Sequence, residues 1–198
     1  MGITLYDFPT SGHAHRIRLF LGLLGIEYEK VIVDMPAGGH KTLEYLALSP
    51  LGQVPTMVDG DVVVTDSTAA LVYLARKYGR DDWLPLDPAG AAAVQRWLST
   101  ASGELYRGPI ALRAARRFGR PVDEPAALAW SKRLFDWMQA HLSEHQWLAS
   151  DHPTIADVAM YSYVRVADEG DCAIEPYPSV LRWLADVESL PNFEAMPR

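Results

Sequence analysis

The stretch Leu48–Tyr78 decides the fold, and it reads LSPLGQVPTMVDGDVVVTDSTAALVYLARKY. Val54-Pro55 leads into a segment rich in β-branched residues, and an X-Pro bond at the entry to a strand is where a cis peptide is tolerated. We expect such a bend to turn the backbone N–H and C=O of Val54 outward, where they can pair with an extended peptide ligand. Asp59-Gly60 is a hairpin signal, so Val62–Val64 is predicted to return as the next strand.

The same stretch ends in a predicted helix. Residues 65–68, TDST, are typical of a helix N-terminus, and apolar residues at helical spacing follow them as far as Tyr78. Gly79 is the expected stop. The start of a helix offers unpaired N–H groups and a partial positive charge, which favour a bound carboxylate. We therefore expect Leu48–Tyr78 to hold a small peptide that carries an acid.

Composition limits the function classes. The chain has 198 residues, with 25 acidic side chains against 18 basic ones and a net charge of −7, which argues against nucleic acid or an anionic membrane as a partner. The single cysteine, Cys172, excludes an internal disulfide and a Cys-x-x-Cys motif. No apolar run approaches the roughly 18 residues of a membrane span, and no signal pattern opens the sequence, so the expected location is the cytoplasm.

The residues before the central stretch complete an α/β pattern. ITLYDF at residues 3–8 alternates like a short strand, residues 17–24 have helical apolar spacing that stops at Gly25, and Tyr28–Val33 is predicted as a second strand. A short helix is expected around Lys41–Leu46. Residues 1–79 thus have the order βαβαββα, which predicts a thioredoxin-like α/β domain.

The rest of the chain is predicted to be helical. Residues 80–89, rich in Asp and Pro, are the expected linker, and residues 90–198 are the expected all-α domain. Ala91–Phe118 has helical spacing that Gly103, Gly108 and Pro109 should bend or interrupt. Thr154 and Asp157 form a capping-box variant at the start of a nearly all-apolar helix, which we expect to be buried.

Together these motifs resemble a known family. A βαβαββα half carrying LGQVP and DSTAALVYL, followed by a helical half carrying TIADV, resembles the cytosolic glutathione transferases over nearly the whole chain. SGHAHRIRL resembles their serine-type classes, especially the phi-like pattern with Ser11 at the first helix start and Arg16 within the helix. The resemblance implies an enzyme that uses glutathione as co-substrate and holds no permanent cofactor and no metal.

The resemblance assigns the catalytic role to Ser11. At pH 7 only a few per cent of a thiol with a pKa of about 8.5 is thiolate, and lowering that pKa by ~2 units needs roughly 2.7 kcal/mol. A hydrogen bond from the Ser11 hydroxyl, together with the positive end of the first helix, is sufficient for this. Thr10 is the chief alternative donor, and His13 is a candidate neighbour of the thiol. The other role open to Ser11 is that of an ordinary N-cap.

The remaining glutathione contacts are also implied by matched motifs. His40 and Lys41 are expected to meet the glycine carboxylate, and Gln53 and Val54 the tripeptide backbone. Pro55 is expected to set the geometry of the loop, which matters more than any contact that it makes with the ligand. The γ-glutamyl ammonium is assigned to Asp66, where many relatives carry glutamate, and the γ-glutamyl carboxylate to Ser67.

A second substrate, a small hydrophobic electrophile, is expected between the two halves. Phe8, Pro9, Tyr106 and Ile110 are its candidate apolar walls. The family is usually dimeric, so a homodimer is expected, with Leu51 at the position of the side chain that enters the partner. Relatives often carry an aromatic residue there.

Three classes of function remain open from the sequence. The first is a glutathione S-transferase that conjugates hydrophobic electrophiles, with a glutathione-dependent peroxidase or disulfide reductase as a close variant. The second is a non-catalytic protein of the same fold that binds hydrophobic ligands. The third is a subunit that keeps the fold for protein contacts.

Overall fold

A computed structural model describes residues 2–198. The chain forms two compact units. One contains the residues up to Gly79 together with Pro191–Arg198, and the other contains Arg80–Leu190. The last residues of the expected helical domain therefore belong to the first unit.

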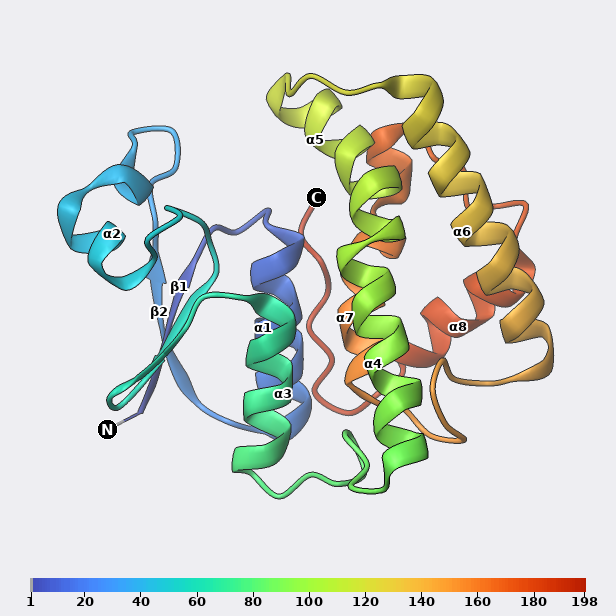
Figure 1. The fold of residues 1–198 in the computed structure, drawn as a ribbon, viewed down its shortest axis with the longest axis horizontal. Helices are drawn as coiled ribbons and strands as arrows, with labels where there is room; N and C mark the ends of the chain where they lie inside the picture. Colours follow the sequence, from blue (N-terminus) through green and yellow to red (C-terminus); the bar gives the residue numbers. More distant parts are fainter. Residues whose placement is uncertain (1) are drawn as a thin grey trace. The chain divides into compact units, whose positions relative to one another are not determined.

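The first unit is a four-stranded mixed sheet with helices, in the predicted βαβαββα order, which is thereby confirmed. The sheet order is β2-β1-β3-β4, with β1 parallel to β2 and antiparallel to β3 (Figure 1). Its elements are β1 (Ile3–Asp7), α1 (Gly12–Leu24), β2 (Tyr28–Ile32), η1 (Gly39–Lys41), α2 (Leu43–Leu48), β3 (Thr56–Asp59), β4 (Val62–Val64) and α3 (Ser67–Lys77).

Local sequence signals explain where these elements begin and end. Gly25 adopts the left-handed conformation (φ 67°) and closes α1 by donating to carbonyls of its last turn. Gly60 (φ 60°) makes the turn between β3 and β4, as the Asp59-Gly60 pair predicts. α1 and α3 pack against each other, and both begin at the upper end of the unit in Figure 1.

The second unit is helical. Its elements are α4 (Pro88–Ser102), η2 (Tyr106–Ile110), α5 (Ala111–Phe118), α6 (Glu124–Glu144), α7 (Ile155–Arg165), η3 (Ala167–Gly170) and α8 (Pro178–Glu188). α4 begins at Pro88, inside the segment expected as a linker. The expected interruption of Ala91–Phe118 is present as a π-helical turn that contains Pro109. Within residues 2–198, no helix combines the length and the apolar character that crossing a membrane requires.

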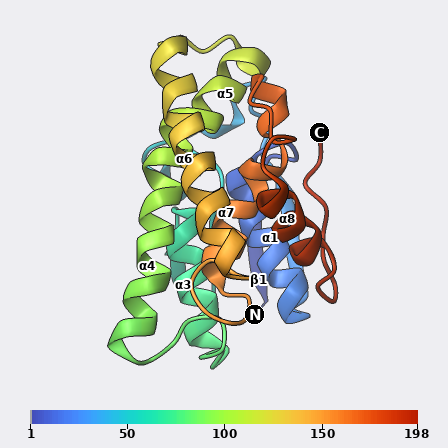
Figure 2. The same cartoon turned by 90° about the vertical axis from the view of Figure 1, so that its right-hand side faces the viewer.

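α7 forms the centre of the helical unit and is almost entirely buried, as its apolar sequence predicts. Figure 2 shows it flanked by α4, α6 and α8. The capping box at its start is present, because Thr154 and Asp157 exchange hydrogen bonds between side chain and backbone. Asp157 also accepts hydrogen bonds from the Leu148 N–H at 3.1 Å and the Trp183 indole at 2.9 Å. One carboxylate thus joins α7 to α8 and to the preceding loop.

Candidate functional site

Ser11 directly precedes α1 and caps it. Its Oγ accepts a hydrogen bond from the Ala14 N–H at 3.2 Å, and its own N–H donates to the Phe8 carbonyl at 2.8 Å, which closes the turn after β1. A serine hydroxyl that accepts one hydrogen bond keeps its proton for a second partner. The N-cap role and a donor role toward a ligand are therefore compatible at Ser11. The neighbouring Thr10 is half-buried in the same turn.

Arg16 links the start of α1 to the start of α3. Its Nη1 lies 3.0 Å from His13 Nδ1 and donates to Ser67 Oγ at 3.1 Å. Because a guanidinium only donates, His13 Nδ1 accepts, and the imidazole carries its proton on Nε2. Burial, followed by the charge of Arg16, lowers the pKa of His13 to about 3. His13 is therefore a neutral ring that faces Ser67, whose Oγ lies 3.4 Å from Nδ1, and a role beside the thiol stays a prediction.

Asp66 caps α3 and is exposed. Its Oδ1 accepts hydrogen bonds from the Thr68 hydroxyl at 2.6 Å and the Ala69 N–H at 2.8 Å. Although Asp66 is exposed, the neighbouring protein partly desolvates its carboxyl group, which opposes ionisation. The hydrogen bonds from Thr68 and Ala69 outweigh this effect, so the pKa of Asp66 lies below its usual value. Asp66 is thus a carboxylate at neutral pH and can pair with an ammonium group.

The backbone of Gln53 is fixed by two side chains of the preceding segment. The Tyr45 hydroxyl donates to the Gln53 carbonyl at 2.7 Å, and Ser49 Oγ both donates to that carbonyl at 3.0 Å and accepts from the Gln53 N–H at 3.3 Å. The Val54–Pro55 peptide bond is cis. Within the described part of the chain, the Val54 N–H and C=O make no hydrogen bond, so they remain available to a ligand.

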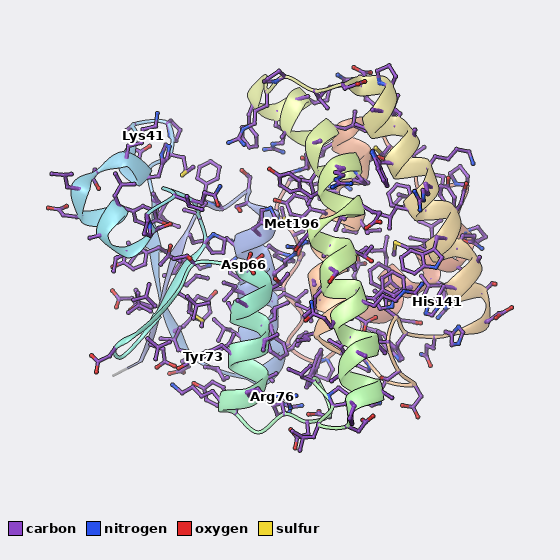
Figure 3. The ribbon with its side chains drawn as sticks, in the orientation of Figure 1. Lys41, Asp66, Tyr73, Arg76, His141 and Met196 are labelled. Atoms are coloured by element: carbon purple, nitrogen blue, oxygen red, sulfur yellow. The ribbon has the colours of Figure 1, made fainter. Side chains whose placement is uncertain are left out.

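His40 and Lys41 lie beside this loop. Gly52 (φ 58°) brings the loop so close to them that a Cβ at this position would lie 2.8 Å from the His40 carbonyl oxygen. The Nδ1 of His40 is buried and has no hydrogen-bond partner among residues 2–198. Lys41 is exposed, and Figure 3 shows it on the segment that leads into α2, while Asp66 lies at the start of α3.

The expected walls of the second-substrate site are divided between the two units. Phe8 is half-buried and Pro9 exposed, and both belong to the first unit. In the second unit Tyr106 is 52% exposed, whereas Ile110 is buried. A hydrophobic site built from these four residues stays a prediction.

Within residues 2–198, the structure contains no group of three or more histidine, cysteine or acidic side chains that could hold a metal ion.

Sequence reasoning missed the residues that support the site. Tyr45 and Ser49 hold the Gln53 backbone, and Arg16 orders Ser67. In the sequence, Arg16 appears only as one residue of the SGHAHRIRL motif, and Tyr45 and Ser49, on or next to a short amphipathic helix, suggest ordinary packing. The left-handed φ at Gly52 has a signal in the sequence, because a glycine just before Gln53-Val54 is typical of a turn.

Comparison with known proteins identifies related sequences and folds. The family model "Glutathione S-transferase, N-terminal domain" matches residues 1–76, and "Glutathione S-transferase, C-terminal domain" matches residues 119–191. Glutathione S-transferase 3 of Zea mays is 31% identical over 97% of this chain and 91% of its own length.

Two solved structures extend the comparison. A glutathione S-transferase from Pseudomonas fluorescens Pf-5 is 28% identical, with a TM-score of 0.91 and full coverage of both chains (100% each). A glutathione transferase homologue from Drosophila mojavensis, with bound glutathione, is 25% identical, with a TM-score of 0.87 over 96% of this chain and 89% of its own. Because both family models match and the likeness extends over nearly the full length, this chain belongs to the glutathione S-transferase family of enzymes.

Proposed function

We propose that this enzyme binds glutathione in its first unit, stabilises the thiolate with Ser11, and conjugates the thiolate to small hydrophobic electrophiles, as in the serine-type, phi-like classes. The observation that carries the proposal is the pair of helix starts joined by Arg16. Ser11 caps α1 and Ser67 begins α3, and the guanidinium bonded to Ser67 belongs to α1. The Ser11 hydroxyl can donate to a thiolate, and the Ser67 hydroxyl and the first N–H groups of α3 can donate to a carboxylate. The two packed helices α1 and α3 hold these donors in place.

The γ-glutamyl end of glutathione would lie at the start of α3. Its carboxylate would accept hydrogen bonds from the Ser67 hydroxyl and from the first N–H groups of the helix, where the helix dipole favours an anion. Its ammonium group would pair with the ionised Asp66. The glutathione-bound structure of the Drosophila mojavensis homologue supports the assignment of glutathione as the ligand.

The middle and the glycine end of glutathione would follow the loop before β3. The unpaired N–H and C=O of Val54 would bind the cysteinyl backbone as a neighbouring strand does. Lys41 would pair with the glycine carboxylate, and the buried Nδ1 of His40 would gain the hydrogen-bond partner that it lacks among residues 2–198. Gln53 is exposed and its backbone is fixed, which suits a side chain that orients the tripeptide.

The chemical step requires little more than the thiolate. The thiol proton leaves to solvent as the Ser11 hydroxyl and the positive end of α1 stabilise the sulfur anion. With an aryl halide, the sulfur attacks the ring carbon, an S–C bond forms, and the halide leaves with the electrons of the broken bond. Ser11 acts only as a hydrogen-bond donor and forms no covalent bond in this scheme.

Kinetics of the wild type and of Ser11→Ala test the proposal. We expect kcat/KM with an aryl halide to fall by about 10²-fold in the variant, in line with the loss of one preorganised donor. The affinity for glutathione, measured by calorimetry, should change little. An organic hydroperoxide as second substrate separates conjugation from peroxidase activity. Equal rates for Ser11→Ala and wild type would remove Ser11 from the mechanism, and binding without turnover of either substrate would favour a carrier protein.

We also propose that the enzyme is a homodimer with Leu51 at its interface. The Leu51 side chain is 81% exposed on the loop before Gly52. Covering such an exposed leucine with a partner subunit removes apolar surface from water, which favours association. An aliphatic side chain in this place buries less area than an aromatic one would.

A further inference from the structure

Arg18 is a buried charge that the proposed mechanism does not use. The residue lies on α1 and is 1% exposed, and each of its three donor nitrogens is bonded. Nη1 donates to Asp7 Oδ1 at 2.6 Å, Nη2 to the Pro9 carbonyl at 3.0 Å, and Nε to Glu194 Oε1 at 2.9 Å. The guanidinium thus joins the end of β1, the turn that leads to Ser11, and the C-terminal segment.

The C-terminal segment Pro191–Arg198 lies along α1, beside which Figure 1 shows it in red. His15 Nε2 lies 2.9 Å from the Glu194 carbonyl oxygen, so the imidazole donates to it. Two residues before Glu194, the Asn192 carbonyl oxygen approaches Gly22 so closely that a Cβ on Gly22 would lie 3.0 Å away. Side-chain and backbone contacts therefore dock this segment at two turns of the helix.

Glu194 determines how Arg18 is oriented. The planar guanidinium binds each partner in a fixed direction. Asp7 neutralises its charge from one side, and Glu194 holds Nε from the other. If the Glu194 carboxylate is removed, we expect the guanidinium to rotate toward Asp7 and its hydrogen bond to the Pro9 carbonyl to weaken. Pro9 lies in the turn that the Ser11 N–H closes by donating to the Phe8 carbonyl at 2.8 Å.

We propose that Arg18 and Glu194 are positioning residues for Ser11, and that the C-terminal segment is a strap which holds the Ser11 turn in the geometry for thiolate stabilisation. The inference rests on the proposed role of Ser11. Within residues 2–198, the hydrogen bonds of the Arg18 guanidinium go to Asp7, Pro9 and Glu194, and none goes to Asp66, Ser67 or Gln53. The strap therefore affects stabilisation of the thiolate and leaves the affinity for glutathione unchanged.

The test compares Glu194→Ala and Glu194→Gln with the wild type in the full chain. The Glu194 side chain is 39% exposed, so both variants should fold. Glutamine keeps an oxygen that can accept from Arg18 Nε, and it should retain most of the effect. Glu175→Ala, which removes an exposed acidic side chain of the helical unit, is the matched control.

Three readouts separate positioning from a structural role: calorimetry of glutathione binding, the pH titration of the bound thiol by its ultraviolet difference spectrum, and kcat with an aryl halide. For Glu194→Ala we expect an unchanged Kd, a thiol pKa raised by about one unit and a roughly tenfold lower kcat, since small misplacement of a donor has a large effect on rate. Glu194→Gln should lie close to wild type.

The inference is overturned by a wild-type thiol pKa and kcat in Glu194→Ala, or by a loss of glutathione affinity that parallels the loss of rate. If Glu194→Ala does not fold, Glu194→Asp replaces it, because its carboxylate is one methylene group shorter and falls short of Arg18 Nε. A raised thiol pKa with an unchanged Kd in Glu194→Asp upholds the inference, and wild-type values there overturn it. Failure of the proposed function gives a different result, in which the wild type itself forms no thiolate with bound glutathione.

Discussion

Single side chains at this site serve the fold and the ligand at once. The Ser11 oxygen caps α1 while its proton stays available, and Asp66 caps α3 while its charge stays available. Because each side chain can serve both roles, the sequence alone cannot distinguish helix capping from ligand binding at Ser11 or at Asp66. It also means that a substitution must keep the cap if it is to test the ligand contact alone.

Asp66→Asn meets that condition, because asparagine caps helices as well as aspartate does. We expect the stability of the variant to stay within about 0.5 kcal/mol of wild type, while its Kd for glutathione rises about tenfold through the loss of the ion pair with the ammonium group. Calorimetry with glutathione and with an analogue that lacks the γ-glutamyl amino group checks this. The variant and the wild type should bind the analogue equally, and a persisting difference would place the ammonium elsewhere.

Buried histidines of α1 make the first unit sensitive to acid. Burial lowers the pKa of His15 to about 4, and the nearby Arg18 charge adds to this effect against the opposing hydrogen bond to the Glu194 carbonyl. The unfolded chain binds a proton at this histidine below about pH 6.5, whereas the folded chain does not until about pH 4. Stability is therefore lost as the pH falls through this window.

The histidine contribution can be isolated with His15→Gln, whose amide nitrogen can replace Nε2 as donor to the Glu194 carbonyl. Between about pH 6 and pH 4.5, the slope of the unfolding free energy against pH should be roughly 1.4 kcal/mol per unit smaller in the variant. Urea unfolding at several pH values measures both slopes. Parallel slopes would show that His15 does not remain neutral in the fold.

At the scale of the elements, the loop before β3 depends on one glycine. Gly52 and Gly60 have nearly the same left-handed φ, 58° and 60°, but only Gly52 has a backbone atom in the path of a Cβ, the His40 oxygen at 2.8 Å. Gly60→Ala should cost about 1 kcal/mol from backbone strain alone, and Gly52→Ala about 1–3 kcal/mol more from the clash.

The clash should also appear in binding. Gly52→Ala displaces His40 and Lys41 from the loop of Gln53, so we expect its Kd for glutathione to rise at least tenfold, whereas Gly60→Ala binds normally. Chemical denaturation and calorimetry on both variants give the comparison. If the two variants are equally stable and bind equally well, the close approach of the two segments does not occur.

The elements themselves could be predicted largely from the sequence. The period of two in residues 3–7, the helical spacing that ends at Gly25 and the Asp59-Gly60 turn are local signals, and each reports on neighbouring residues only. The supporting contacts could not be predicted in this way. The Arg18–Glu194 and Asp157–Trp183 bonds join residues far apart in the sequence, and no local period or spacing encodes them.

At the scale of the whole molecule, the proposed dimer gives a direct prediction. Burial of a leucine contributes about 1.5–3 kcal/mol, so Leu51→Ser should weaken self-association at least tenfold. Leu43→Ser is the matched control, because Leu43 is 87% exposed in the same unit and has no proposed interface role. Sedimentation velocity over a concentration series distinguishes them. A monomeric wild type, or equal effects of the two substitutions, would contradict the assignment.

We propose above all that Ser11 stabilises the thiolate of bound glutathione. The most direct measurement is the ultraviolet difference spectrum of the glutathione complex, titrated with pH in the wild type and in Ser11→Ala. We expect a bound-thiol pKa near 6.5 in the wild type, ~2 units below that of a free thiol, and a return toward about 8.5 in the variant. Identical titrations of the two complexes, or an unshifted thiol in the wild type, would contradict it.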